Sequence, residues 1–213
     1  MTSSQIVSSN VRAASKEDAR ASGLRALAGV TVVWFACAVV VSVSGVMAWL
    51  PPPMIPLFVL GSNVALWAWY RRSGALRTFA DGVSLRAFAA LHVPRAAFGA
   101  QFLAMVGEGR MPASVGLHAG YGDIVAGVLA LAVAVVPVRE TTHRKALFAW
   151  NVIAFVDIVT VVAAFQRALL IERHPGLMAT FPHWPYPMLP FFIVPWVVAT
   201  HLYVFKRLRS GTV

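Results

Sequence analysis

Three charged side chains stand inside apolar stretches of this sequence, where a lipid bilayer would surround them. Arg95, Asp123 and Asp157 each lie in a separate stretch. Helical rise places Arg95 roughly 18 Å and Asp157 roughly 15 Å from one membrane face, with Asp123 roughly 9 Å below the other. Charges at such depth are costly and usually face a protein interior. We therefore predict a buried polar centre that binds a substrate, a proton or a cofactor. The alternative is an Arg–Asp pair that only locks three helices together.

Two histidines and an asparagine accompany these charges. His92 precedes Arg95 by three residues and so shares its helical face, and Pro94 between them is expected to kink the helix. His201 lies about one turn from the cytoplasmic end of the last apolar stretch, and could form a haem-ligand pair with His92, although their predicted depths differ by about 7 Å. The candidate site residues are Arg95, Asp123, Asp157, His92, Asn151 and His201.

A second group of ionisable residues lies outside the apolar stretches. Carboxylates and imidazoles suit zinc or copper, but the spacing of this group matches no ligand motif. We predict no metal site and interpret these side chains as loop residues at the wet interface. Cys37, the single cysteine, cannot form an intrachain disulfide. The weak metal-ligand candidates are His118, Glu108 and His174, with Glu172 and His183 nearby.

The composition is that of a membrane protein. The chain is 59% hydrophobic and 12% charged, whereas about 25% of the residues of a soluble domain are charged. Several apolar stretches approach or exceed the roughly 20 residues that cross a bilayer, and in lipid the backbone of such segments must be helical. The net charge of +10 comes from basic residues that flank these stretches. This position indicates membrane orientation and argues against a nucleic-acid binder.

We therefore predict an all-α integral membrane bundle of about six transmembrane helices. Residues 1–23 are predicted to be a mostly disordered polar cytoplasmic tail, followed by one transmembrane domain over residues 24–209. A triple proline at residues 51–53 is expected to end the first helix. The expected helices cover roughly residues 24–50, 54–70, 83–106, 117–138, 147–171 and 188–205.

Charge asymmetry predicts the orientation of the bundle. With six spans, the basic residues collect on one side, which is the cytoplasmic side by the positive-inside rule. Both termini are therefore predicted to be cytoplasmic, in a multi-pass protein of the cytoplasmic (inner) membrane. The basic residues assigned to that side are Arg12, Lys16, Arg20, Arg25, Arg71, Arg72, Arg77, Arg139, Arg144, Lys145, Lys206, Arg207 and Arg209, against Arg110 and Arg173 outside and Arg167 near the outer boundary.

The polar positions also form a wider pattern. It consists of Arg-x-x-x-Gly-x-x-Phe from Arg95, Ala-Gly-x-Gly-Asp ending at Asp123, Trp-Asn ending at Asn151 and followed by Asp157, and Leu-Pro-x-x-x-x-Pro followed by His201. This pattern resembles a group of bacterial multi-span membrane proteins with no assigned activity, over roughly residues 81–208. The resemblance implies that these positions form one unit and supplies no chemistry.

Three classes of function fit these observations. The first, which we favour, is a small-molecule or proton-coupled transporter built around the buried charges. The second is a membrane-embedded haem or redox protein that uses His92 and His201. The third is a non-catalytic membrane subunit or assembly factor. Whether the chain is an enzyme is left open. The expected partners are the lipid bilayer and a second copy of the chain or other membrane subunits.

Overall fold

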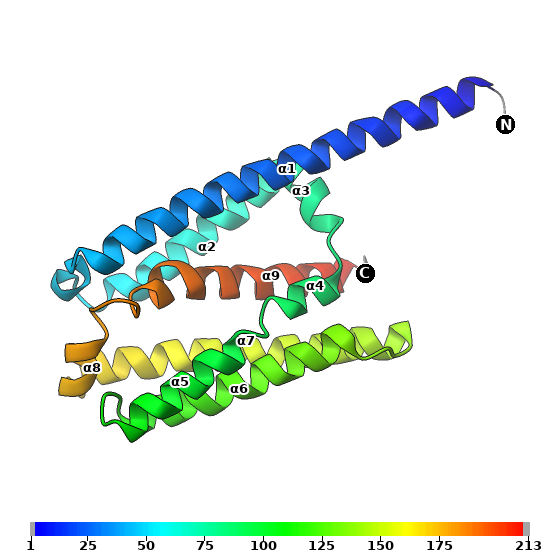
Figure 1. Cartoon of the computed structure of the whole chain (residues 1–213). Helices are drawn as coiled ribbons and strands as arrows, with labels where there is room; N and C mark the ends of the chain where they lie inside the picture. The colour runs from blue at the N-terminus through cyan, green and yellow to red at the C-terminus, as the bar shows by residue number, and fades with distance from the viewer. Residues whose placement is uncertain (1–2, 211–213) are drawn as a thin grey trace.

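The computed structural model describes residues 3–210, and this part of the chain is helical throughout, without a β-strand. The helices run back and forth along one common direction (Figure 1). Two short helices, α3 and α8, form within segments expected to be loops. The elements are α1 (Ser3–Val43), η1 (Val46–Trp49), α2 (Met54–Arg72), α3 (Gly74–Asp81), α4 (Leu85–Ala90), α5 (Arg95–Gly107), α6 (Ala113–Val135), α7 (Glu140–Leu170), α8 (Pro175–Thr180), η2 (Leu189–Ile193) and α9 (Val194–Ser210).

Four helices within the described residues are long and apolar enough to cross a membrane. They cover residues 14–43, 113–135, 140–170 and 189–210. The chain is thus all-helical with the character of a membrane protein. Helix α2 and the α4–α5 pair do not meet the same length and hydropathy limits, although they run alongside the four candidate spans (Figure 1).

The first helix differs from the prediction at both ends. It begins at Ser3 and so includes the segment expected to be disordered; alanine, lysine, glutamate and arginine in this segment all favour helix. It ends at Val43, before the prolines, because Gly45 adopts a left-handed φ of 71° that stops the helix. The N-terminal part of α1 projects beyond the other helices (Figure 1).

The single helix expected over residues 83–106 is broken into α4 and α5. Pro94 has no N–H, and its ring excludes a helical carbonyl four residues earlier, at Ala90. The chain passes the break in tight turns, in which the Ala90 carbonyl accepts from the Val93 N–H at 3.1 Å and the His92 carbonyl from the Arg95 N–H at 3.1 Å. The carbonyls of Ala90 and His92 are therefore paired within the break itself, and Arg95 becomes the first residue of α5.

Helix α6 packs against both α5 and α7. Gly99 on α5 faces Gly120 on α6 so closely that a Cβ at Gly99 would lie 2.4 Å from the Gly120 carbonyl oxygen. Small residues at such a contact are what allows two helix backbones to approach this closely. This close approach lets short side chains on α6 reach groups on α5.

A hydrogen bond links helix α1 to the segment before α9, at a carbonyl that a proline leaves free. Pro195 cannot donate to the carbonyl of Phe191, four residues earlier, and the chain there forms a π-turn, η2. The Trp34 indole N–H donates to that carbonyl at 2.7 Å. Side-chain donors commonly satisfy carbonyls freed by proline in membrane helices.

Candidate functional site

Arg95 holds the centre of the molecule together through three neighbouring groups. Its Nε donates to Asp123 Oδ1 of α6 at 2.6 Å, its Nη2 donates to Asp157 Oδ2 of α7, and its Nη1 donates to the Ala154 carbonyl at 3.1 Å. Arg95 is 4% exposed and Asp123 7% exposed. The structure thus brings together the three residues whose depths suggested a common layer.

The position of Asp157 depends on a glycine that the sequence analysis did not identify. A Cβ on Gly122 would lie 1.7 Å from Asp157 Oδ1, so no other residue type fits there without displacing the carboxylate. Three other glycines of α6, Gly116, Gly120 and Gly127, face α5 instead. The signal for Gly122 was present in the run Gly-Tyr-Gly-Asp, but only the relative rotation of α6 and α7 reveals which glycine meets Asp157.

The centre contains more negative than positive charge. Two carboxylates face one guanidinium, which gives a charge of −1 if Arg95, Asp123 and Asp157 are all ionised. The N-terminal end of α5, at which Arg95 lies, supplies only about half a positive charge. Uptake of one proton by the carboxylate pair removes the excess. The arrangement can therefore bind a proton or exchange it for a cationic or polar group.

His92 and His201 form a second buried group beside this centre. They are 1% and 0% exposed, and their ring centroids lie 4.3 Å apart. His201 Nδ1 lies 2.7 Å from Asn151 Oδ1, and the Asn151 amide donates to the His201 carbonyl at 3.2 Å. His92 Nε2 lies 2.9 Å from Thr200 Oγ1. The six predicted candidates thus form two clusters that follow one another along α7, where Asn151 precedes Asp157 by six residues.

The contact between the two imidazoles does not fit haem ligation. Two axial imidazoles each need about 2 Å between nitrogen and metal, which places their ring centroids roughly 6 Å apart or more. His92 and His201 are closer than that and touch directly. His92 Nδ1 and His201 Nε2 have no hydrogen-bond partner in the described part of the chain. In this arrangement the pair is a packed polar contact rather than a porphyrin site.

A mostly apolar cavity of about 70 Å³ adjoins Arg95 and Asp123. A water molecule needs about 10–15 Å³ of such space, so the cavity has room for several waters or a small apolar group. Its walls come from α2, α5, α7 and the last helix, and they include Phe98 and Phe165. Gln166 also lines it, and its Oε1 is buried without a partner among the described residues. The charged centre therefore borders a mainly apolar space.

The residues considered as weak metal ligands do not come together. Glu108 pairs with Arg110, His118 Nε2 lies 2.8 Å from Thr160 Oγ1, and His174 Nδ1 accepts from the backbone of α8 at 3.4 Å. Within residues 3–210, no three histidine, cysteine or acidic side chains are grouped so that they could hold a metal ion. Each of these residues instead has a local partner that accounts for its position.

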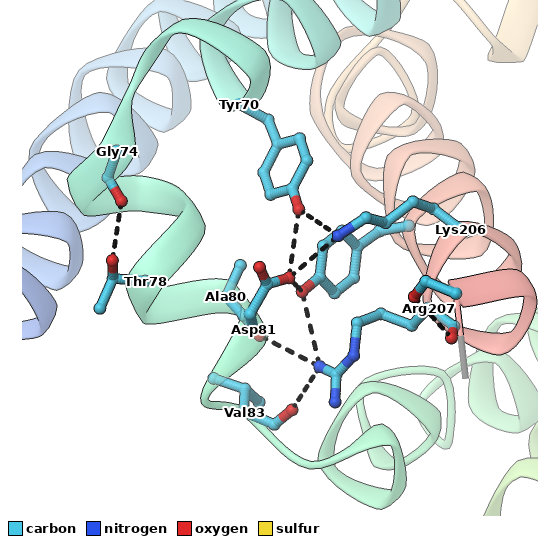
Figure 2. Close-up of polar contacts among 10 residues, drawn as sticks. Tyr70, Gly74, Thr78, Ala80, Asp81, Val83, Lys206 and Arg207 are labelled. Carbon is cyan, nitrogen blue, oxygen red and sulfur yellow. Dashed lines mark hydrogen bonds and ion pairs between the residues drawn. The ribbon is translucent and has the colours of Figure 1, made fainter. Parts of the chain in front are cut away.

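A further charged cluster, which the sequence pattern did not predict, lies at the C-terminal end of α9 (Figure 2). Asp81, the last residue of α3, accepts from the hydroxyls of Tyr203 at 2.7 Å and Tyr70 at 3.1 Å, and Lys206 Nζ donates to it at 3.2 Å. Arg207, 3% exposed, donates to backbone carbonyls beside Asp81. Burial raises the pKa of Asp81, but the hydrogen bonds from Tyr203 and Lys206 outweigh it and leave the pKa below its usual value. This cluster fastens α9 to α2 and α3.

Comparison with known proteins places the chain in a family. A family model described as "Domain of unknown function (DUF8737)" matches residues 52–209. The chain belongs to this family. No curated protein and no solved structure matches the chain. The matched region starts within the segment before α2, so it includes both polar clusters and leaves out α1.

Proposed function

We propose that this member of the DUF8737 family is a proton-coupled carrier of small molecules in the cytoplasmic membrane of a bacterium. It would cross the membrane six times, with α2 and the α4–α5 pair as spans beside the four longer helices. The clustering of basic residues at the end that holds the α6–α7 turn and the C-terminus supports cytoplasmic termini. The bilayer is then its main partner.

The observation that carries this proposal is the pairing of two buried carboxylates with one arginine. Asp123 and Asp157 both contact Arg95, and bilayer depth makes an uncompensated charge costly. One proton shared by the carboxylates relieves that cost. Loss of the proton would in turn make the centre ready to accept another positive or polar group. Coupling between a proton and a substrate follows from this competition.

The broken helix and the adjoining cavity support the same function. Discontinuous helices at bilayer depth commonly surround the binding sites of transporters. Here the break between α4 and α5 ends at Arg95, and the apolar cavity borders Arg95 and Asp123. A small, mainly apolar substrate in this cavity would contact the group that holds the proton.

The proton site is tested by infrared difference spectroscopy of the purified protein in lipid. We expect a protonated carboxyl band at neutral pH that is lost in Asp123→Asn or Asp157→Asn. The matched control is Asp18→Asn, because Asp18 is an exposed carboxylate on α1. A spectrum in which both buried carboxyls are ionised at neutral pH would contradict the proposal.

Transport is tested in the same variants after reconstitution. Currents on a solid-supported membrane would be recorded while short-chain amines, aromatic amines and aromatic alcohols are applied under a pH gradient. We expect a current with at least one class, reduced at least about tenfold in either buried variant and unchanged in Asp18→Asn. If the variants lose abundance but keep their specific current, the charged centre only fastens the helices, and the chain fits a non-catalytic subunit instead.

A further inference from the structure

A second cavity, separate from the charged centre, lies between α2 and α9. It has a volume of about 240 Å³ and is walled mainly by apolar and aromatic side chains, among them Trp67, Phe79 and Phe88. An apolar cavity of about 150 Å³ is already large enough to bind benzene. We call this space the α2–α9 cavity. Neither Arg95 nor either buried aspartate lines it.

Two side chains that line the α2–α9 cavity each bury a polar atom without a partner in residues 3–210. Asn63 Nδ2 donates to the Val59 carbonyl at 2.8 Å, which leaves the Asn63 Oδ1 acceptor unpaired. Trp196 Nε1, a donor, is also unpaired. An unpaired buried polar group costs about 1–3 kcal/mol, so both atoms favour any group that completes their hydrogen bonds.

The two residues that carry these atoms occupy corresponding positions on their helices. Helices α2 and α9 pack together and run in the same direction (Figure 1). Tyr70 on α2 and Tyr203 on α9 contact each other, with ring centroids 5.4 Å apart. Asn63 precedes Tyr70 by seven residues and Trp196 precedes Tyr203 by seven, so each lies two turns, about 10 Å, from its tyrosine and on the same helical face.

The α2–α9 cavity adjoins the charged cluster of Figure 2 through Tyr70 and Tyr203. Tyr70 and Tyr203 line the cavity, and Lys206 Nζ lies 5.2 Å from the centre of the Tyr70 ring. Lys206 and Arg207 are bound there to Asp81 and to backbone carbonyls. The unsatisfied hydrogen-bonding capacity of the cavity walls is thus found at Asn63 and Trp196.

We propose that the α2–α9 cavity binds an aromatic alcohol, whose hydroxyl donates to Asn63 Oδ1 and accepts from Trp196 Nε1. A hydroxyl is the smallest group that is both donor and acceptor, and it matches one unpaired acceptor and one unpaired donor. Aromatic rings suit walls made of tryptophan, phenylalanine and tyrosine. The ligand enters from the membrane, because Leu91 at the cavity wall is 66% exposed on the outer surface of the bundle.

The test compares two compounds of the same shape, 2-naphthol and 2-methylnaphthalene, with the full-length protein in lipid nanodiscs. Affinities are measured by equilibrium binding with wild type, Asn63→Leu and Trp196→Phe. Two hydrogen bonds of typical strength correspond to a preference for 2-naphthol of at least about tenfold in wild type. We expect this preference to fall by at least about threefold in either variant and to persist in Trp49→Phe, a control at an exposed tryptophan.

Because the two compounds have the same shape, the comparison in wild type alone is decisive even if a variant fails to fold. Equal affinities in wild type would overturn the proposal, since Asn63 and Trp196 would then hold only water. A preference that stays unchanged in both folded variants would also overturn it, because the hydroxyl would be recognised elsewhere.

Discussion

At the residue scale, Arg95 is the side chain on which the centre of the molecule depends. It links α5 to α6 and α7 through two carboxylates and one backbone carbonyl. A buried ion pair adds little net stability compared with an apolar contact of the same size, but removal of one partner leaves the others uncompensated. Substitution of Arg95 alone is therefore expected to destabilise the protein more than simultaneous replacement of Arg95 and both carboxylates.

We expect Arg95→Gln to lower the free energy of unfolding by about 3–5 kcal/mol, because two carboxylates then share a buried site without a cation. The triple variant with Asp123→Asn and Asp157→Asn should recover part of this loss. Unfolding in mixed micelles measures the free energy of unfolding of the single and the triple variant. Arg25→Gln, at an exposed arginine of α1, should change little. A triple variant no more stable than Arg95→Gln would contradict this account.

The Asp81 cluster predicts a dependence of stability on acid. Since the folded pKa of Asp81 is lowered, its contribution is fully present above the unfolded pKa of about 3.9 and is lost as pH falls through the folded value. The stability difference between wild type and Asp81→Asn should therefore be constant above about pH 5 and shrink below about pH 4. Asp81 is partly exposed, so the difference should stay within about 1 kcal/mol.

Unfolding curves at several pH values would check this dependence. Asp18→Asn provides the baseline for loss of an exposed carboxylate. A difference that grows as the pH falls would have the opposite sign and would exclude the hydrogen bonds from Tyr203 and Lys206 as its cause.

At this scale the sequence reveals which side chains are buried better than it reveals what they touch. Depth along ideal helices placed Arg95, Asp123 and Asp157 in one layer, and the structure brings them together. The same estimate separated His92 from His201 by about 7 Å in depth, whereas their rings are in contact. The break at Pro94 changes the path of the chain there, and an estimate that assumes a continuous helix misses it. The functional role of these five residues stays a prediction.

At the element scale, the close packing of α5 against α6 determines how far their side chains must reach. Asp123 has a short side chain, so Arg95 can meet it only if the helix axes are close. Gly99 and Gly120 provide that closeness. Substitution at this contact is therefore expected to disturb the charged centre without changing any charged residue.

We expect Gly99→Ala to destabilise the protein by about 1–3 kcal/mol, because the new methyl group would meet the Gly120 carbonyl. Gly61→Ala is the matched control on α2, where no described atom lies within 4 Å of the position of a Cβ. It should be neutral or stabilise by up to about 1 kcal/mol, since alanine favours helix. Thermal unfolding of both variants in the same detergent checks the contrast. Equal effects would show that α5 and α6 do not need this contact.

The boundaries of the elements show where sequence patterns are informative. Apolar length and basic flanks located α2 and α6 within about four residues, whereas α7 begins at Glu140, seven residues before its predicted start, and α9 ends at Ser210, five residues after its predicted end. The helix break before Arg95 was anticipated only as a kink, because proline in a helix produces either result according to its neighbours. Helices α3 and α8 are too short for periodicity to identify, and tertiary contacts decide whether such segments fold.

At the scale of the whole molecule, the orientation in the membrane can be tested with single cysteines. In a background with Cys37→Ser, we expect Glu108→Cys and His183→Cys to react with an impermeant maleimide added to intact cells. Ser73→Cys and Thr141→Cys should react only after permeabilisation, because the basic residues that flank them predict a cytoplasmic position. Labelling of positions 73 and 108 from the same side would contradict a membrane crossing by the α4–α5 pair.

The wide sequence separation of the central contacts has a consequence for how the protein is made. Arg95 is synthesised 62 residues before Asp157, which corresponds to about 3–12 s at ordinary rates of translation. Until Asp123 and Asp157 have followed, the α4–α5 segment carries a cation for which lipid offers no partner, and neither α4 nor α5 is long enough to count among the candidate spans. We therefore expect it to remain at the membrane surface or in the translocation channel until α6 and α7 follow. Truncated nascent chains with a glycosylation acceptor near Glu108 would reveal this as a delay in its translocation, so that α5, α6 and α7 enter the bilayer as one late-inserting group.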